Sequence, residues 1–225
     1  WTGHVPADIG PKTPAGTLEP VTIVAARNGS FSGKVVVDSA RAISGLKASI
    51  GDLAGDGATI PARHVRVRYA ALWEERGWGR PSHADILLES PPEVVQAESG
   101  RALAPVWVTV TVPRDAKACL YAGELVVEAE GLAPTKVPVK LDVQDWTLPD
   151  SQAYRTWMDL VQSPDTLAME YDVPLWSQRH WELIHRSFRL MSGTGSRTLY
   201  VPLICRTNFG NEQSMVRWID KGDGK

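Results

Sequence analysis

The sequence predicts a mainly β protein with an α/β C-terminal part, that is, an antiparallel β-sandwich followed by an incomplete (β/α) barrel segment of βαβ form. Short runs rich in Val, Ile and Thr recur between turn signals up to residue 143. No segment before residue 150 has the apolar spacing of a helix, whereas a strand, a helix and a second strand are indicated after residue 149. We therefore expect an extended N-terminal arm over 1–18, a β-sandwich domain over 19–148 and the first βαβ portion of a (β/α)8-barrel-like domain over 149–225.

The strands of the sandwich are predicted from composition and from alternation. They are 21–25, 34–38, 46–50, 64–69, 106–112, 124–129 and 136–143. In one of them Val65, Val67 and Tyr69 alternate with Arg66 and Arg68, which is the period of a sheet with one wet face. An apolar sheet face needs a cover, and because no helix is predicted here the cover should be a second sheet.

The sequence pattern changes after residue 149. Residues 154–160 and 197–204 are predicted strands, and the second is dense in apolar residues, as strands buried on both faces are. Between them, after a predicted loop, Ser177 should cap a helix over about 178–192. Its apolar stripe is expected at helical spacing, at Trp181, Ile184, Phe188 and Met191.

Composition limits the classes of function. The chain has 225 residues and a formal net charge of −2, so it lacks the summed positive field that attracts nucleic acid or anionic membrane. No apolar run approaches the roughly 18 residues of a membrane span. Cys119 and Cys205 fall in different predicted domains, and their spacing indicates neither a disulfide framework nor a metal cluster. His180 and His185 are five residues apart, whereas the two histidines of a zinc-binding helix are four apart. We expect no cofactor and no metal site.

Candidate binding residues come from the loops that follow predicted barrel strands, because barrel chemistry sits there. The polar side chains of these loops could hydrogen-bond sugar hydroxyls, and the alternative for each is a cap or a turn. They are Gln162, Arg206, Asn208, Asn211 and Glu212. No catalytic residue is predicted: two adjacent carboxylates occur only at Glu74-Glu75, in a segment that resembles a solvated loop.

Several stretches resemble proteins related to glycoside hydrolase family 123, in their N-terminal sandwich and early barrel. They are AARNG at 25–29, SIGDL at 49–53, VWVTVTVPRDA at 106–116, YAG at 121–123, DWTLP at 145–149, and PLWS at 174–177 with His180-Trp181. The resemblance implies a secreted or periplasmic protein with a β-sandwich and a (β/α)8 barrel that hydrolyses β-linked N-acetylhexosaminides by a substrate-assisted route. In that route an Asp orients the substrate acetamide and an adjacent Glu protonates the leaving group.

This Asp-Glu pair has no counterpart in the sequence, and the part after residue 148 is shorter than the roughly 250 residues of a full barrel. We therefore expect the chain alone to be inactive. An incomplete barrel exposes an open sheet edge, so we expect 149–225 to pack on the sandwich, to be poorly ordered, or to pair with a partner: the remainder of the barrel on another chain, or a second copy.

A different class remains open, a non-catalytic carbohydrate-binding or structural β-sandwich module. A coplanar exposed platform formed by Trp73, Trp78 and Trp107 would favour carbohydrate binding, and buried tryptophans would weigh against it. A purely structural spacer would have neither platform nor pocket.

Overall fold

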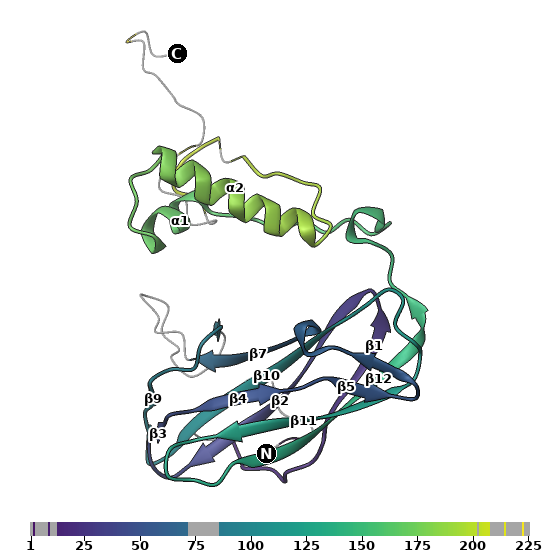
Figure 1. Ribbon diagram of the computed structural model, residues 1–225. Coiled ribbons are helices and arrows are strands. Elements are labelled where there is room, and N and C mark those ends of the chain that lie inside the picture. Colours follow the sequence, from purple (N-terminus) through teal and green to yellow (C-terminus); the bar gives the residue numbers. More distant parts are fainter. Residues whose placement is uncertain are drawn as a thin grey trace. The chain divides into compact units, whose positions relative to one another are not determined.

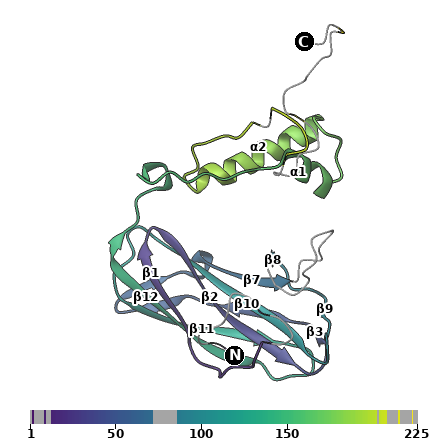
Figure 2. The same cartoon turned by 180° about the vertical axis from the view of Figure 1, so that it is seen from behind.

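The computed structural model describes residues 2, 9, 13–71, 86–201, 203–207, 214 and 222. The chain divides into two compact units, Trp1–Leu148 and Pro149–Lys225. The first is a β-sandwich and the second is built around two helices (Figures 1 and 2). In the described ranges no helix is long and apolar enough to cross a membrane.

The sandwich has two main sheets and one small one. The larger sheet runs β1 (Val21–Arg27), β12 (Thr135–Thr147), β11 (Leu120–Glu128), β5 (Leu53–Gly55), β6 (Ala58–Ile60), with β4 (Lys47–Ile50) also paired to β11. The second runs β2 (Gly29–Ser39), β10 (Ala102–Val112), β7 (Val65–Ala71), β8 (Ile86–Leu88), and β3 (Ile43–Ser44) pairs with β9 (Val94–Val95). The ladders are antiparallel except for β1 with β12, which is parallel.

All of the strands predicted in this region overlap observed strands, and the mainly β fold class is confirmed. The predicted alternation is also confirmed, because Tyr69 is buried while Arg66 is exposed. Five strands, β3, β5, β6, β8 and β9, were not predicted, since two or three residues are too few to show a period of two.

The core lies between the two main sheets and consists mostly of β-branched side chains. Val106, Val108 and Val110 of β10 face Val139 and Leu141 of β12 across this core, and all five are fully buried. Tyr69 of β7 joins the two sheets, because its hydroxyl accepts a hydrogen bond of 2.8 Å from the backbone N–H of Ala48 in β4. The core is therefore apolar with one polar cross-link.

The chain changes sheets at the predicted turn Asn28-Gly29. Asn28 has a φ of 61°, in the left-handed region that asparagine tolerates. Its backbone N–H donates to Val112 O and its side-chain amide donates to Leu148 O, both at 2.9 Å. This corner lets β1 and β2 belong to different sheets although one residue separates them.

The second unit contains η2 (Ser151–Ala153), α1 (Pro164–Glu170) and α2 (Gln178–Gly193). The bounds of α2 and its Ser177 cap are as predicted: Ser177 Oγ accepts from the backbone N–H of His180 at 3.2 Å. The predicted loop before α2 is wrong in part, because α1 lies within it. Ser163 caps α1, Pro164 opens it and Asp165 occupies its first turn, which are ordinary start signals.

The two predicted strands of the second unit are wrong in detail. In the described parts of 154–160 and 197–204 no strand forms, and one parallel bridge joins Met158 to Ser196. The reason is burial: a parallel strand is stabilised by covered faces, yet Trp157, Leu199 and Val201 remain exposed. The unit thus keeps the order and the parallel sense of a βαβ segment without extended ladders.

The buried side of α2 also differs from the prediction. His180, Leu183 and Ile184 are buried, whereas Trp181 is 37% exposed. The buried stripe is therefore centred about one residue earlier than the predicted one, because α1 packs against the N-terminal part of α2.

Candidate functional site

Gln162 lies in the loop between the Met158 bridge and Ser163, the N-cap of α1. Its amide oxygen and nitrogen are both shielded from solvent, and neither has a hydrogen-bond partner in the described chain. A buried amide without partners costs about 1–3 kcal/mol. A polar group held in this state is a candidate for binding something that the rest of the structure does not supply.

Arg206 is exposed and lies in the described segment 203–207, with a φ of 55°. No hydrogen bond or ion pair joins it to Gln162. The other three candidates, Asn208, Asn211 and Glu212, lie outside the described residues. Of the predicted set of five the structure describes two, Gln162 and Arg206, and the set as a whole stays a prediction.

A buried histidine positions the loop that contains Gln162. His180 is fully buried, and its Nδ1 accepts from the backbone N–H of Trp176 while its Nε2 lies 2.8 Å from Pro164 O. A backbone N–H only donates and a carbonyl only accepts, so the ring is neutral with the proton on Nε2. His180 is therefore a fixed link between the start of α1 and the start of α2.

Trp176 and Trp181 form a contact across the N-terminus of α2. Their ring centroids are 5.6 Å apart, and the residues occupy the N′ and N4 positions around the Ser177 cap. This is the arrangement of a hydrophobic staple, which fixes the angle at which the chain enters a helix. Trp176 has a φ of 63°, unusual for a bulky residue, and its N–H bond to His180 holds that conformation. These aromatic residues therefore have a structural role.

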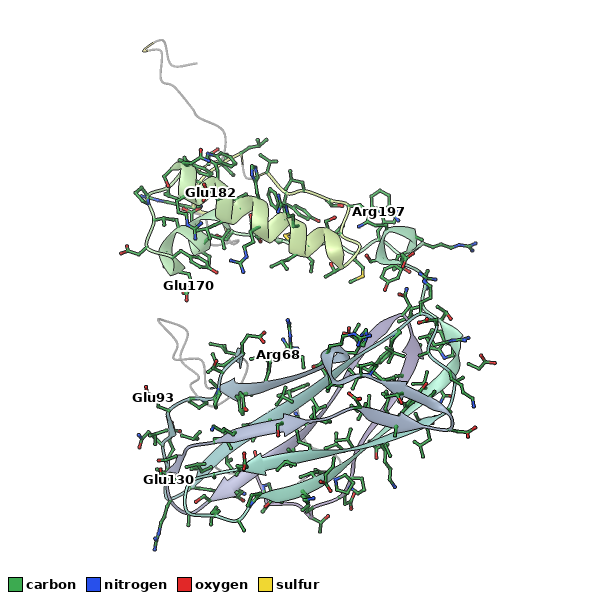
Figure 3. All side chains as sticks on the ribbon, in the orientation of Figure 1. Arg68, Glu93, Glu130, Glu170, Glu182 and Arg197 are labelled. Carbon is green, nitrogen blue, oxygen red and sulfur yellow. The ribbon has the colours of Figure 1, made fainter. Side chains whose placement is uncertain are left out.

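The described carboxylates of this unit do not form an acid–base pair. Glu182 accepts hydrogen bonds from Arg179 at 3.1 Å and from Gln178 at 3.5 Å, and the Arg179 bond is the main cause that holds its pKa below the usual value. A general acid needs the opposite shift. Glu170 and Glu182 lie on different helices, as Figure 3 shows. Asp165 is buried in the first turn of α1.

An open cavity of about 230 Å³ lies at the other end of α2. It is lined by Phe188, Met191, Ser192, Ser196, Arg197, Thr198 and Leu199. The loops that follow barrel strands lie near the N-terminus of the next helix, and α2 is about 24 Å long at its 1.5 Å rise per residue. Gln162 is not among the residues that line this cavity, so the cavity is not the expected sugar site.

Two hydrogen bonds from Arg197 join the segment after α2 to the segment that contains η2. Its guanidinium donates to Gln152 O at 2.7 Å and to Tyr154 O at 2.9 Å, which joins the segment after α2 to η2 (Figure 3). Gly195, with a φ of 90°, lies against Ser151 O in the same place. These contacts hold the two bridged segments side by side.

The tryptophan platform proposed for the sandwich is only partly observable. Trp73 and Trp78 lie outside the described residues, and Trp107 is half-buried with Lys34 Nζ 4.8 Å from its ring centroid. The platform of three rings stays a prediction.

Comparison with sequence families decides the relationship of the chain. The profile of the glycoside hydrolase 123 N-terminal domain matches residues 11–129, which is more than half of the chain. The chain belongs to the glycoside hydrolase 123 family. The profile of the glycoside hydrolase 123 catalytic domain matches residues 161–225, in the second unit. The resemblance inferred from the short stretches above is thereby confirmed.

One solved structure shows the same fold. A family 123 glycoside hydrolase from Clostridium perfringens, studied for glycolipid glycan hydrolysis, matches with a TM-score of 0.74 at 18% identity. The match covers 89% of this chain and 37% of that one, so the chain spans little more than a third of that enzyme.

Two further matches have TM-scores of 0.31, too low to carry an argument. The periplasmic chaperone SfaE is 7% identical, with 61% of each chain covered. A PapD-like domain of human CEP192 is 12% identical, with 65% of this chain and 96% of that one covered. A comparison with curated protein sequences gave no match.

Proposed function

We propose that this chain is the N-terminal portion of a glycoside hydrolase-like protein that acts on β-linked N-acetylhexosaminides, and that the catalytic Asp-Glu pair lies outside residues 1–225. The observation that carries the proposal is the order of the two family matches, an N-terminal domain at 11–129 followed by a catalytic domain at 161–225. The Clostridium perfringens relative, studied for glycolipid glycan hydrolysis, supports a glycan as the substrate.

Within this proposal Gln162 contributes to the sugar-binding rim. Gln162 lies in the part that matches the catalytic domain and follows the first bridged segment of the second unit, where barrel enzymes place binding residues. Its shielded amide has both a donor and an acceptor to offer, as a sugar hydroxyl requires. Arg206, Asn208, Asn211 and Glu212 follow the second bridged segment in the sequence and belong to the same proposed rim.

The proposal includes a cover for the apolar surface of the second unit. Many large apolar side chains there are exposed: Trp157, Met158, Leu160, Val161, Leu199, Tyr200, Val201, Leu203 and Ile204. We propose that further sequence of the same catalytic domain covers this surface. The alternative cover is a second copy of the chain. Light scattering distinguishes the two, because pairing with a second copy would make the 225-residue chain a dimer.

The activity test compares two proteins on p-nitrophenyl N-acetyl-β-galactosaminide and N-acetyl-β-glucosaminide. The 225-residue chain should release no p-nitrophenol, whereas a polypeptide that continues it through a complete catalytic domain should hydrolyse at least one substrate. In the longer protein Gln162→Ala should lower kcat/KM about tenfold, the worth of a sugar hydrogen bond, and Gln178→Ala on exposed α2 surface should not. Hydrolysis by the 225-residue chain itself would refute the location of the acid pair.

We infer a secreted or periplasmic location from the resemblance to family 123 alone. Fractionation of the producing cells tests this, and recovery of the protein in the cytoplasmic fraction would contradict it.

A further inference from the structure

Two of the stretches quoted from the sequence, AARNG at 25–29 and DWTLP at 145–149, lie next to each other in the sandwich. The first spans the end of β1 and the turn into β2, and the second spans the end of β12 and the residues after it. β1 and β12 are neighbouring strands of the larger sheet (Figures 1 and 2). We call residues 25–29 the corner and residues 145–148 the strap, because the chain leaves the sandwich through residues 145–148.

The strand register changes where the strap begins. Ala25 pairs with Val143 and Arg27 pairs with Thr147, so two steps along β1 match four steps along β12. The extra residues of β12 form a bulge, which bends a strand and changes the direction of its side chains. Asp145 lies in this bulge, and Arg27 Nη2 donates to its Oδ1 at 2.9 Å. The corner therefore holds the first residue of the strap.

Leu148, the last residue of the strap, is bound by three consecutive residues of the corner. Its backbone N–H donates to Arg27 O and its carbonyl oxygen accepts from the side-chain amide of Asn28, both at 2.9 Å. Its side chain lies against Gly29, where an added Cβ would come within 2.6 Å of Leu148 Cδ1. A residue larger than glycine at this position would displace the strap. The corner thus holds the strap at both of its ends.

The chain is bound again just after the strap, within the second unit. Asp150 O accepts from the backbone N–H of Ala153 at 2.7 Å, and Gln152 Nε2 donates to Ser192 O at 2.9 Å. The boundary between the two compact units falls at the end of the strap. Pro149 and Asp150 are therefore the connection between the strap and η2.

We propose that the corner and the strap form a fastening that sets the length of the connection between the two units. With the strap fastened the connection is 149–150, and with the strap released it is 145–150. Since an extended chain spans at most about 3.5 Å per residue, release raises its reach from about 7 Å to about 20 Å. The fastening gives Asn28 and Gly29 a role beyond the turn between β1 and β2, and it does not depend on the proposed hydrolase function.

Amide exchange followed by NMR tests the fastening in the 225-residue chain. The Leu148 amide should be protected in the wild type, because it donates to Arg27 O. The double variant Arg27→Gln/Asn28→Gly removes both side-chain bonds of the corner, and glycine keeps the left-handed backbone of position 28. It should speed exchange of the Leu148 amide about tenfold or more and leave β10 unchanged. The matched control Lys117→Gln breaks the 2.9 Å ion pair with Asp56 elsewhere in the sandwich and should change this exchange less than about twofold.

Paired spin labels test the length of the connection. One label is placed on the exposed side of β12 and the other on the exposed side of α2, in a chain without its native cysteines. The substitutions are Lys140→Cys, Arg189→Cys, Cys119→Ser and Cys205→Ser. The distribution of distances between the labels should be broader in the double variant than in the wild type, because a longer connection permits more arrangements. Lys117→Gln should leave its width unchanged.

An unprotected Leu148 amide in the wild type would overturn the proposal, whether or not the double variant folds. Equal exchange of this amide in the double variant and in Lys117→Gln would do the same. Equal widths of the distance distributions in the wild type and the double variant would also overturn it. Since these measurements involve no hydrolysis, their failure would leave the proposed hydrolase function untouched.

Discussion

Replacing His180 with alanine should destabilise the second unit selectively. The change removes both hydrogen bonds of a fully buried ring, the one from Trp176 N–H and the one to Pro164 O, each 2.8 Å long. It also removes the contact that holds Trp176 in a left-handed conformation. The start of α1 and the start of α2 would then lose their common anchor.

The expected loss of stability in His180→Ala follows from the two backbone groups that lose their hydrogen-bond partner, Trp176 N–H and Pro164 O. A backbone donor or acceptor that loses its partner away from water costs about 1–3 kcal/mol, and two are affected here. The cavity left by the ring adds to this. We expect a loss of about 3 kcal/mol in the free energy of local unfolding, which corresponds to a rise of about a hundredfold in the open fraction.

Hydrogen exchange followed by mass spectrometry measures this effect unit by unit. Amides of α1 and α2 should exchange about a hundredfold faster in His180→Ala, while peptides of β10 should be unchanged. The matched control is His185→Ala, an exposed histidine of the same helix that lies 6.3 Å from the Trp181 ring. Equal exchange in the two variants would refute the reasoning, because it would show that the buried ring carries no more of the stability than an exposed one.

Three further predictions concern stability. Tyr69→Phe should lower the free energy of unfolding of the sandwich by about 1–2 kcal/mol in urea titrations, because Ala48 N–H loses its acceptor, and an unchanged midpoint would contradict this. Arg101 donates two hydrogen bonds to Asp38 and thereby lowers the pKa of that carboxyl, so Asp38→Asn should cost about 1 kcal/mol at pH 7. A lowered pKa gives stability that is present above the ordinary aspartate pKa of about 3.9 and lost as pH falls through the folded value, so wild type and variant should converge in urea titrations below about pH 3. Gly195→Ala should speed hydrogen exchange in residues 151–154, since Gly195 has a φ of 90° and a Cβ would lie 2.8 Å from Ser151 O; normal exchange there would mean that the loop relaxes freely.

The sandwich was predictable because its strands carry their own evidence. A run such as Val106–Val112 within β10 alternates for long enough to reveal which face is buried. The parallel pairing of β1 with β12 was not predictable, because alternation reports faces and says nothing of neighbours. The strands of two or three residues were not predictable, because so few residues cannot show an alternation of buried and exposed positions.

The second unit was harder to predict because its signals depend on tertiary context. The apolar run at 197–204 indicates burial, but apolar density predicts a strand only where both faces are covered, and Leu199 and Val201 are exposed. The helix α1 did have readable start signals at Ser163 and Pro164, and its seven residues fell below the window in which helical periodicity shows.

In the candidate site, too, the position of a residue in a loop was predictable from the sequence and its burial was not. Sequence alone placed Gln162 in a loop after the first barrel segment, and the structure has it in a loop. The shielding of its amide had no local signal in the sequence. The role of His180 had a partial signal, because it stands at the N3 position after Ser177, where a side chain reaches back to the helix start in a capping box.

The distribution of buried apolar side chains separates the two units physically. In the described part of the second unit only Ala168, Leu183 and Ile184 are buried apolar residues, whereas the sandwich core draws on every long strand. Burying a leucine or isoleucine contributes about 1.5–3 kcal/mol, and ordering each residue of the backbone costs about 1–2 kcal/mol. Three buried side chains cannot offset the ordering of a segment that includes two helices. The described part of this unit should therefore gain stability wherever a further surface buries the apolar side chains that are exposed in it, such as Trp157 and Leu203.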